Sequence, residues 1–221
     1  MPPHPTNLAN LRQTYDTQGL LDENVPASPD ALFDRWMQDA IDTGIKEPNA
    51  MTLATVDADG APDARIVLLK GLDDLGDGRR GFRFFTNYTS VKAAELEANP
   101  RAALVFYWDA PDRSVRVRGT VHKLDERAST DYFHSRPRGS QLGAWVSDQS
   151  AVIPDRDVLR RREAELEARY ADREIPRPPH WGGYVVTPDA IEFWQGQPSR
   201  LHDRIRFRFA SGQWTWQRLA P

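Results

Sequence analysis

The stretch that decides the fold runs from Ile191 to Phe209 and reads IEFWQGQPSRLHDRIRFRF. Gly196 and Pro198 interrupt it. Because glycine tolerates positive φ and proline fixes φ, we expect two strands joined there by a tight connection. From position 204 to 209 arginine alternates with Ile or Phe. This period of two is typical of a strand with one buried face.

The same stretch carries side chains suited to a flat, anionic ligand. Arg200 and Arg204 can bind phosphate or carboxylate through a forked pair of donors, and Trp194 can supply an apolar wall. His202 lies between the two arginines. Basic residues on a solvated strand face and a tryptophan in the core would give the same pattern. This stretch alone therefore leaves a binding site and a structural role equally open.

The composition indicates a soluble globular protein. Of 221 residues, 39% are hydrophobic and 28% are charged, and the net charge of −3 gives no global basic field of the kind that nucleic-acid binders use. The absence of cysteine excludes disulfides and thiolate chemistry, and the five histidines are scattered, so we expect no metal site. No apolar run reaches the roughly 18 residues that span a bilayer. With no N-terminal signal pattern either, we expect a cytoplasmic protein without membrane contact.

The order of the patterns predicts a mainly β (α+β) chain. Residues 1–27 are polar and proline-rich and are expected to form an N-terminal arm, followed by a single domain over 28–221. A helix should begin at Ser28-Pro29 and end at Gly44. Short strands with turn signals between them follow, which favours a small β-barrel or sandwich. The strands are expected at 51–56, 64–70, 82–86, 102–108, 114–121, 184–187 and 204–209, and further helices near 91–98, 126–134 and 155–170.

Three clusters combine cations with hydroxyl groups or apolar walls. The first is Arg65 with Lys70. The second is Lys92 beside Thr89 and Ser90 at a helix start, where free N–H groups favour an anion, although an ordinary capped helix would look the same. The third is the segment 133–140, FHSRPRGS, which is either a phosphate-binding loop or a solvated basic loop.

The sequence lacks the common nucleotide-binding and hydrolytic motifs. It contains no G-x-G-x-x-G, no P-loop, no H-E-x-x-H and no G-x-S-x-G. Several phosphate-binding clusters on a small β-domain therefore suggest a phosphorylated planar cofactor, a phosphorylated substrate, or both.

Seven motifs in order resemble the pyridoxine/pyridoxamine 5′-phosphate oxidase family. The resemblance runs from about Leu11 to the last residue. The longest motif, at 132–150, and the pair at 192–196 and 200–204 are the most specific. The motifs are RIVLLK (65–70), FFTN (84–87), YFHSRPRGSQLGAWVSDQS (132–150), WGGY (181–184), EFWQG (192–196), RLHDR (200–204) and RLAP (218–221).

This resemblance implies a fold, an activity and a partner. The fold would be an FMN-binding split β-barrel with peripheral helices, in a homodimer with FMN at the interface. The activity would be the FMN-dependent oxidation of pyridoxine 5′-phosphate and pyridoxamine 5′-phosphate to pyridoxal 5′-phosphate. Flavin would accept the hydride, and O2 would reoxidise it to release hydrogen peroxide, with ammonia from the amine. This is a step of vitamin B6 metabolism.

The resemblance also implies roles for individual residues. Arg200 and His202 would be catalytic. The cofactor would be bound by Arg65, Ile66, Val67, Leu68, Leu69, Lys70, Phe85, Thr86, Lys92, Gln149, Ser150, Trp194 and Arg204. The substrate would be bound by Arg12, Tyr15, Lys70, Tyr132, Arg136, Ser140, Arg200, Leu201 and His202.

Two positions depart from the family pattern. Val91 stands where the family usually has an arginine on the FMN phosphate, and Ser114 stands where a glutamine is common near the flavin. A lost charged hydrogen bond of this kind costs about 1.5–3 kcal/mol unless it is replaced. Two other functions stay open: a split-barrel flavin reductase with another substrate, and a non-catalytic protein that binds FMN or pyridoxal phosphate.

Overall fold

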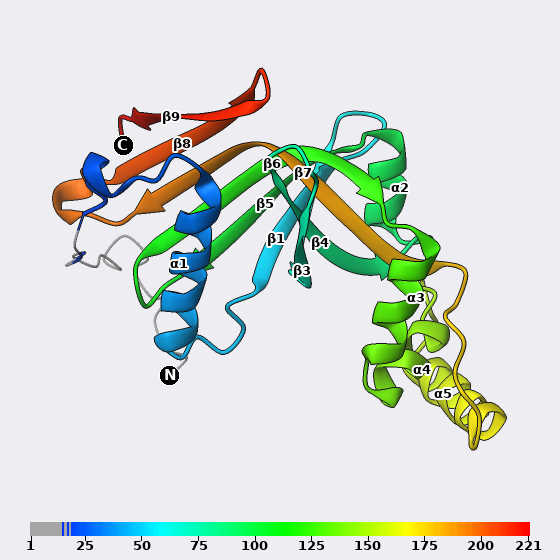
Figure 1. Cartoon of the computed structure of the whole chain (residues 1–221). Coiled ribbons are helices and arrows are strands. Elements are labelled where there is room, and N and C mark those ends of the chain that lie inside the picture. Colours follow the sequence, from blue (N-terminus) through cyan, green and yellow to red (C-terminus); the bar gives the residue numbers. More distant parts are fainter. Residues whose placement is uncertain (1–14, 16, 18) are drawn as a thin grey trace, which may run out of the picture.

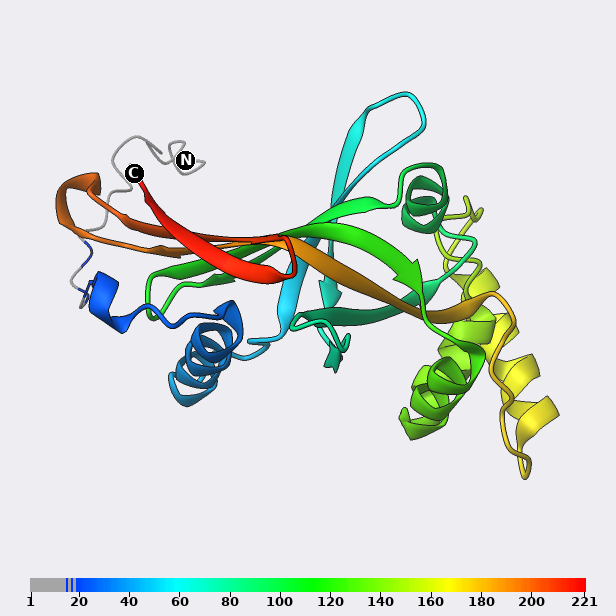
Figure 2. The same ribbon diagram turned by 45° about the horizontal axis from the view of Figure 1, so that its top comes forward.

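A single antiparallel sheet of nine strands organises the chain, with its helices grouped on one face and at one end. The computed structural model describes residues 15, 17 and 19–221, and its arrangement can be followed in Figures 1 and 2. The strand order is β2-β1-β5-β6-β7-β4-β3, with β8 on β7 and β9 on β8. The strands are β1 (Ala50–Val56), β2 (Pro62–Leu68), β3 (Gly71–Asp74), β4 (Arg80–Asn87), β5 (Arg101–Trp108), β6 (Arg113–Lys123), β7 (Trp181–Gln195), β8 (Asp203–Ala210) and β9 (Gln213–Leu219).

The long strand β7 joins the two halves of the sheet. Its residues 184–195 pair with β6, while residues 181–186 pair with β4 and residues 190–195 pair with β8. The pairing with β6 shifts register between Arg118 and Gly119. A Cβ on Gly119 would lie 2.1 Å from the carbonyl oxygen of Thr187, so only glycine fits this bulge. On one edge β7 keeps β6 as its partner, and on the other edge β4 gives way to β8 halfway along the strand.

The helices cover the sheet in two groups. They are α1 (Pro29–Asp42), α2 (Val91–Ala98), α3 (Glu126–Ser135), α4 (Arg138–Val146) and α5 (Asp157–Tyr170), with short 3-10 turns η2 (Asp22–Asn24) and η3 (Pro198–Arg200). Helix α1 lies across one face of the sheet, and α3, α4 and α5 gather at the far end (Figure 1). Ser28 begins α1 as predicted, because its Oγ accepts a hydrogen bond from the N–H of Asp30 at 3.3 Å.

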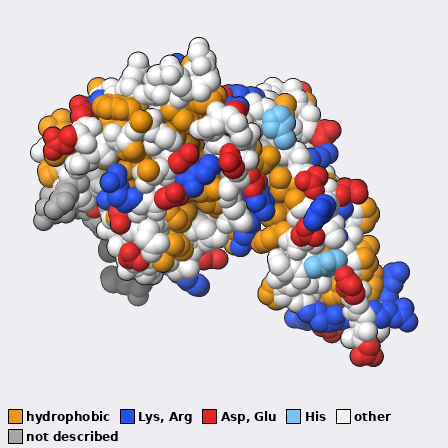
Figure 3. Space-filling model, in the orientation of Figure 1, with side chains coloured by type: hydrophobic (Ala, Val, Ile, Leu, Met, Phe, Trp, Pro, Cys, Tyr) orange, Lys and Arg blue, Asp and Glu red, His pale blue; other side chains and the backbone are white. Residues whose placement is uncertain are grey.

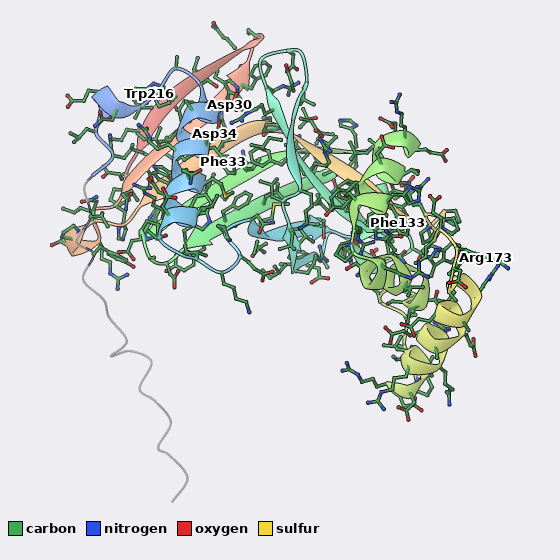
Figure 4. The ribbon with its side chains drawn as sticks, turned by 60° about the horizontal axis from the view of Figure 1, so that its bottom comes forward. Asp30, Phe33, Asp34, Phe133, Arg173 and Trp216 are labelled. Atoms are coloured by element: carbon green, nitrogen blue, oxygen red, sulfur yellow. The ribbon has the colours of Figure 1, made fainter. Side chains whose placement is uncertain are left out.

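Two hydrophobic cores result. In the main core, the α1 residue Phe33 packs edge-to-face on Phe82 and Phe106, with ring centroids 5.2 and 5.3 Å apart. In the smaller core, Phe133 of α3 contacts the first residue of β7, Trp181. Figure 4 shows Phe33 and Phe133 on their separate helices. Figure 3 shows acidic and basic side chains interspersed over the visible face, as the small net charge suggests.

The predicted fold class is confirmed, with two local corrections. The predicted loop 133–140 ends within a helix, because residues 138–146, for which no helix was predicted, form α4 with Pro137 at its N-cap. Arg138 donates to the carbonyl oxygen of Tyr170 at 2.5 Å and so ties α4 to the end of α5. Separate strands before and after position 188 were predicted, but they are the single strand β7, which pairs continuously apart from its bulge. In the described part of the chain, no helix is long and apolar enough to cross a membrane.

Candidate active site

A cationic cavity of about 580 Å³ lies between the sheet and the helices at the far end. Its described lining contains no Asp or Glu, but it contains Arg65, Lys70, Lys92 and Arg136. Strands β2 and β4 form one wall, α2, α3 and α4 supply most of the rest, and five lining residues come from outside these elements: Lys70, Arg136, Ser147, Gln149 and Trp181. The lining residues are Arg65, Ile66, Val67, Leu68, Lys70, Phe85, Thr86, Asn87, Lys92, Tyr132, Arg136, Ser140, Gly143, Ala144, Ser147, Gln149 and Trp181.

Arg65 is already neutralised within the protein. Its guanidinium lies 2.8 Å from the carboxylate of Glu95, whose side chain is only 7% exposed, and 2.7 Å from Asp63. It also donates to Thr55, which in turn donates to Glu95 at 2.5 Å. This network ties β1 and β2 to α2, so Arg65 shapes the cavity wall more than it supplies free charge.

Lys92 lies at the start of α2 and supplies free positive charge. Its Nζ donates to Gln149 Oε1 at 2.8 Å, and Thr86 donates to the same oxygen at 3.0 Å. Burial, and next the charge of Arg65, lowers the pKa of Lys92. The N–H of Val91 donates to Ser150 Oγ at 3.3 Å. A lysine, hydroxyls and a helix N-terminus therefore converge here, which suits a phosphate group.

The other end of the cavity has aromatic walls around Arg136. Tyr132 stacks on Phe85 with ring centroids 3.8 Å apart, and Trp181 lies nearly parallel to both. The guanidinium of Arg136 lies 4.6 Å above the Trp181 ring, and its buried Nη1 has no hydrogen-bond partner among the described residues. Burial lowers the pKa of Arg136, opposed by Tyr132. Because a buried, unpaired donor is costly, an anionic ligand would satisfy it.

A second pocket of about 520 Å³ contains two of the predicted flavin contacts. Trp194 and Arg204 line it with Ser114, and no described residue lines both pockets. Arg204 donates from Nε and Nη2 to Glu192 Oε1 at 3.0 and 2.8 Å, and from Nη1 to the carbonyl of Ala220 at 2.9 Å. The donors of Arg204 are therefore bound within the chain, and its side chain borders the pocket together with the indole of Trp194.

Next to this pocket, Tyr15, Trp194 and His202 form an aromatic cluster. Tyr15 packs edge-on against Trp194 and His202, with ring centroids 5.9 and 5.3 Å away, and the latter two are 4.7 Å apart. The backbone N–H of Gln197 donates to His202 Nδ1 at 3.1 Å. Nδ1 is therefore the unprotonated nitrogen, and the neutral ring carries its proton on Nε2. Burial, and next the charge of Arg200, lowers the pKa of His202 and favours this neutral form.

The turn before His202 holds its backbone in an unusual conformation. Ser199 and Arg200 have φ values of 56° and 64°, a left-handed region that non-glycine residues rarely enter. Such local strain is typical of functional sites. The turn brings Arg200, Leu201 and His202 next to the end of β7.

The predicted site residues thus fall into separate groups. Most of the predicted flavin and phosphate contacts line the cationic cavity, whereas Ser150 is outside the lining and accepts the N–H of Val91, the neighbour of Lys92. Leu69 instead joins the main core and borders a different pocket beside α1. The residues outside the cavity are Leu69, Ser150, Trp194, Arg200, Leu201, His202, Arg204 and Tyr15, and Arg12 lies outside the described residues.

Sequence reasoning missed several residues that shape the cavity. Trp181 was predicted only as part of the WGGY motif and was given no role in the site, although its ring packs against the guanidinium of Arg136. Glu95 carries no local signal, because its partner Arg65 lies 30 residues away. Asn87, Gly143, Ala144 and Ser147 also line the cavity. The last three follow from helix α4, which the sequence reading did not predict.

The antiparallel sheet, with its cationic cavity and aromatic walls beside the helices, defines a β-domain built to bind a small molecule. Residues 37–170 match the family described as pyridoxamine 5′-phosphate oxidase, and residues 181–221 match the pyridoxine 5′-phosphate oxidase C-terminal dimerisation region. The chain belongs to the pyridoxine/pyridoxamine 5′-phosphate oxidase family and is an oxidoreductase of that family.

Curated relatives match almost the whole chain. A pyridoxine/pyridoxamine 5′-phosphate oxidase of Ralstonia pickettii is 55% identical over 98% of this chain and 100% of its own length. The protein of the same name from Acaryochloris marina is 52% identical over 99% of this chain and 98% of its own length.

Solved structures show the same fold. PhzG from Burkholderia lata, solved in complex with tetrahydrophenazine-1-carboxylic acid, is 30% identical with a TM-score of 0.85 over 93% of this chain and 99% of its own. A pyridoxamine 5′-phosphate oxidase-related, FMN-binding protein from Nostoc punctiforme has a TM-score of 0.70 at 15% identity, over 89% of this chain and 98% of its own. The second likeness concerns the fold alone.

Proposed function

We propose that this protein oxidises pyridoxine 5′-phosphate and pyridoxamine 5′-phosphate to pyridoxal 5′-phosphate, with FMN as its cofactor and O2 as the oxidant. The observation that carries the proposal is the buried, unpaired Nη1 of Arg136. Tyr132, Lys70 and Ser140 line the same cavity. The unpaired donor belongs to the guanidinium of Arg136, and the ammonium and the two hydroxyl groups supply further donors. Together these groups suit the phosphate of a small planar substrate.

The residues at the other end of the cavity fit FMN. Its phosphate would be held by Lys92 with the hydroxyl of Ser150 and the N-terminus of α2, where the helix dipole favours an anion. Residues 65–68 of strand β2, with Lys70 just beyond the strand, would lie along the isoalloxazine ring, with Phe85 and Thr86 beside it. Bound FMN would supply the hydride acceptor, and the protein would supply binding, orientation and electrostatics.

Trp194 and Arg204 would reach FMN across a homodimer interface. Within one chain they line a pocket separate from the one lined by Lys92. The match of residues 181–221 to a dimerisation region supports an arrangement in which β7 and β8 face a second copy. In a two-fold interface each copy gives the same surface to the other. Each cationic cavity would then be completed by Trp194 and Arg204 of the partner subunit.

Arg200 and His202 would act on the reacting end of the substrate. Arg200 would orient the pyridine ring, with Leu201 beside it. His202, fixed by the N–H of Gln197, would donate its Nε2–H to the oxygen or nitrogen substituent that reacts. Tyr15 packs on His202 and would cover this end of the site. Arg204 would stabilise negative charge that develops on the cofactor.

One experiment separates this function from the alternatives. Purified protein should be yellow, should release FMN on denaturation, and should produce hydrogen peroxide in step with pyridoxal phosphate when given pyridoxine 5′-phosphate. A flavin reductase would instead oxidise a reduced nicotinamide and leave pyridoxine phosphate unchanged. A binding protein would retain the flavin and turn over neither compound. Either result would overturn the proposal.

A further inference from the structure

Arg218, near the end of β9, binds the segment that leads out of the N-terminal arm. Its Nη2 donates to the carbonyl oxygen of Leu20 at 2.5 Å and to Asp22 Oδ1 at 2.6 Å, and its Nε donates to the same carboxylate oxygen at 2.8 Å. Its Nη1 donates to Asp203 Oδ1 at 2.5 Å. One guanidinium therefore joins residues that lie almost 200 positions apart.

Asp203 completes this contact from the other side. Its Oδ2 accepts a hydrogen bond from the N–H of Leu20 at 3.0 Å. Both backbone polar groups of Leu20 are therefore bound, and its side chain is 7% exposed within the main core. Asp203 is the first residue of β8 and directly follows His202. We call Asp22, Asp203 and Arg218, with the backbone of Leu20, the arm clamp.

Between the clamp and Tyr15 there is a second attachment. Thr17 Oγ1 donates to the carbonyl oxygen of Gly196 at 2.5 Å, and Gln197 Nε2 donates to Thr17 Oγ1 at 3.1 Å. A Cβ on Gly196 would lie 2.8 Å from Tyr15 Cδ1, so the Tyr15 ring rests on this glycine. Gln197 is the residue whose backbone N–H binds His202.

We propose that Arg218 and Asp22 are positioning residues, which act through Tyr15 by holding the arm where that ring covers His202 and Trp194. This proposal rests on the proposed function, because it assigns Tyr15 to the substrate end of that site. The geometry favours positioning over simple stabilisation. The clamp binds the backbone of Leu20, five residues from Tyr15. One of its carboxylates, Asp22, lies two residues after Leu20 in the chain, and the other, Asp203, directly follows His202.

A double-mutant cycle tests the proposal. Arg218→Ala and Asp22→Ala should each lower kcat/KM for pyridoxine 5′-phosphate by about tenfold, mainly through KM, and leave FMN affinity unchanged. Tyr15→Ala should give a similar loss. Combined with Tyr15→Ala, either clamp variant should add little, because residues that act through one another are not additive. Asp22→Glu keeps the carboxylate and should recover most of the affinity.

Arg101→Ala is the matched control. It removes an exposed arginine–aspartate pair, with Asp189, at a distance from the arm. It should change neither KM nor the double-mutant result. Because Asp22 is an exposed residue, Asp22→Ala also guards against a fold-wide effect of Arg218→Ala.

Hydrogen exchange provides a readout that needs no activity. The amide of Leu20 donates to Asp203, so a peptide that contains it should exchange at least tenfold faster in Asp22→Ala and Arg218→Ala than in Arg101→Ala, because the arm opens locally. Fully additive losses with Tyr15→Ala, or unchanged exchange at Leu20, would overturn the clamp even in an active oxidase. An inactive wild-type protein would instead refute the proposed function.

Discussion

The backbone N–H of Gln197 donates a hydrogen bond to Nδ1 of His202 at 3.1 Å. This contact fixes the imidazole as the Nε2–H tautomer, so its free nitrogen is a hydrogen-bond donor at neutral pH. The turn around Ser199 and Arg200 makes the contact possible, because it folds the chain back between Gln197 and His202. A histidine held in this way orients a substituent and does not accept its proton.

The first prediction concerns the pH dependence of turnover. Burial, and next Arg200, lowers the pKa of His202 below its usual 6.5. Protonation would place a hydrogen on Nδ1 and break the hydrogen bond from Gln197 that orients the ring. Because a lowered pKa favours the neutral form, the oriented ring persists as the pH falls through 6.5 and is lost only below it. The acid limb of kcat/KM that belongs to His202 should therefore have its midpoint below 6.5.

The substrate phosphate itself titrates near pH 6, so a reference variant is needed. His202→Gln places an amide N–H near the position of Nε2 and should retain more activity than His202→Ala, without the histidine limb. Steady-state rates from pH 5 to 9 measure both profiles. A wild-type limb that centres above the usual histidine value, or Gln and Ala variants of equal activity, would contradict the donor role.

The second prediction concerns Arg136. Arg136→Met should raise KM for the phosphorylated substrate at least tenfold and change kcat little, because the side chain grips a group that does not react. Without ligand, the variant should be at least as stable to thermal unfolding as the wild type, because the substitution removes a buried donor that has no partner. Steady-state kinetics and thermal unfolding check the two effects.

Arg138 is the matched control for Arg136, two residues away. It donates to the backbone carbonyls of Tyr170 and Arg173 and lies outside the cavity lining. Arg138→Met should therefore lower the melting temperature and leave KM unchanged. If both variants raised KM equally, Arg136 would have no special role in binding phosphate.

The third prediction concerns the buried pair between Arg65 and Glu95. Glu95→Ala should destabilise the protein by about 3–5 kcal/mol, because it leaves a poorly exposed guanidinium without its main partner. Glu95→Gln keeps a hydrogen-bond acceptor and should cost less. Denaturant unfolding without FMN measures the effect on the protein alone. A loss below about 1 kcal/mol would show that Asp63 or solvent compensates for Glu95.

The fourth prediction concerns Val91. This side chain is 51% exposed at the first position of α2, so Val91→Arg should disturb no core packing. It should tighten FMN binding by about 1.5–3 kcal/mol, the value of an added charged hydrogen bond. Fluorescence titration of the apoprotein with FMN measures this. Val152→Arg, at a fully exposed position, adds the same charge elsewhere and should have no effect.

Local patterns predicted most of the elements, because local rules govern them. The cap at Ser28 and the alternation along β8 both appear in the structure as predicted. Helix α4 was missed because Gly139 and Gly143 make its sequence a poor helix former, and packing against α5 outweighs that propensity. The continuity of β7 was hidden by Pro188, which lies at the bulge opposite Gly119.

The candidate site was predictable in its parts but not in its arrangement. The motifs placed Lys70, Tyr132 and Arg136 together, and they do line one cavity. No local pattern could show that Glu95 neutralises Arg65, or that Trp194 and Arg204 face a different hollow. Contacts between distant segments depend on the path of the whole sheet, and contacts between chains depend on a surface that one sequence does not reveal.

The most direct test of the proposed function is the stoichiometry of the reaction. Purified protein loaded with FMN would be mixed with pyridoxine 5′-phosphate in air, and pyridoxal 5′-phosphate, oxygen and hydrogen peroxide would be measured together. We predict equimolar formation of the aldehyde and peroxide, with an equal loss of oxygen. Bound FMN that turns over no pyridoxine or pyridoxamine phosphate would contradict the account.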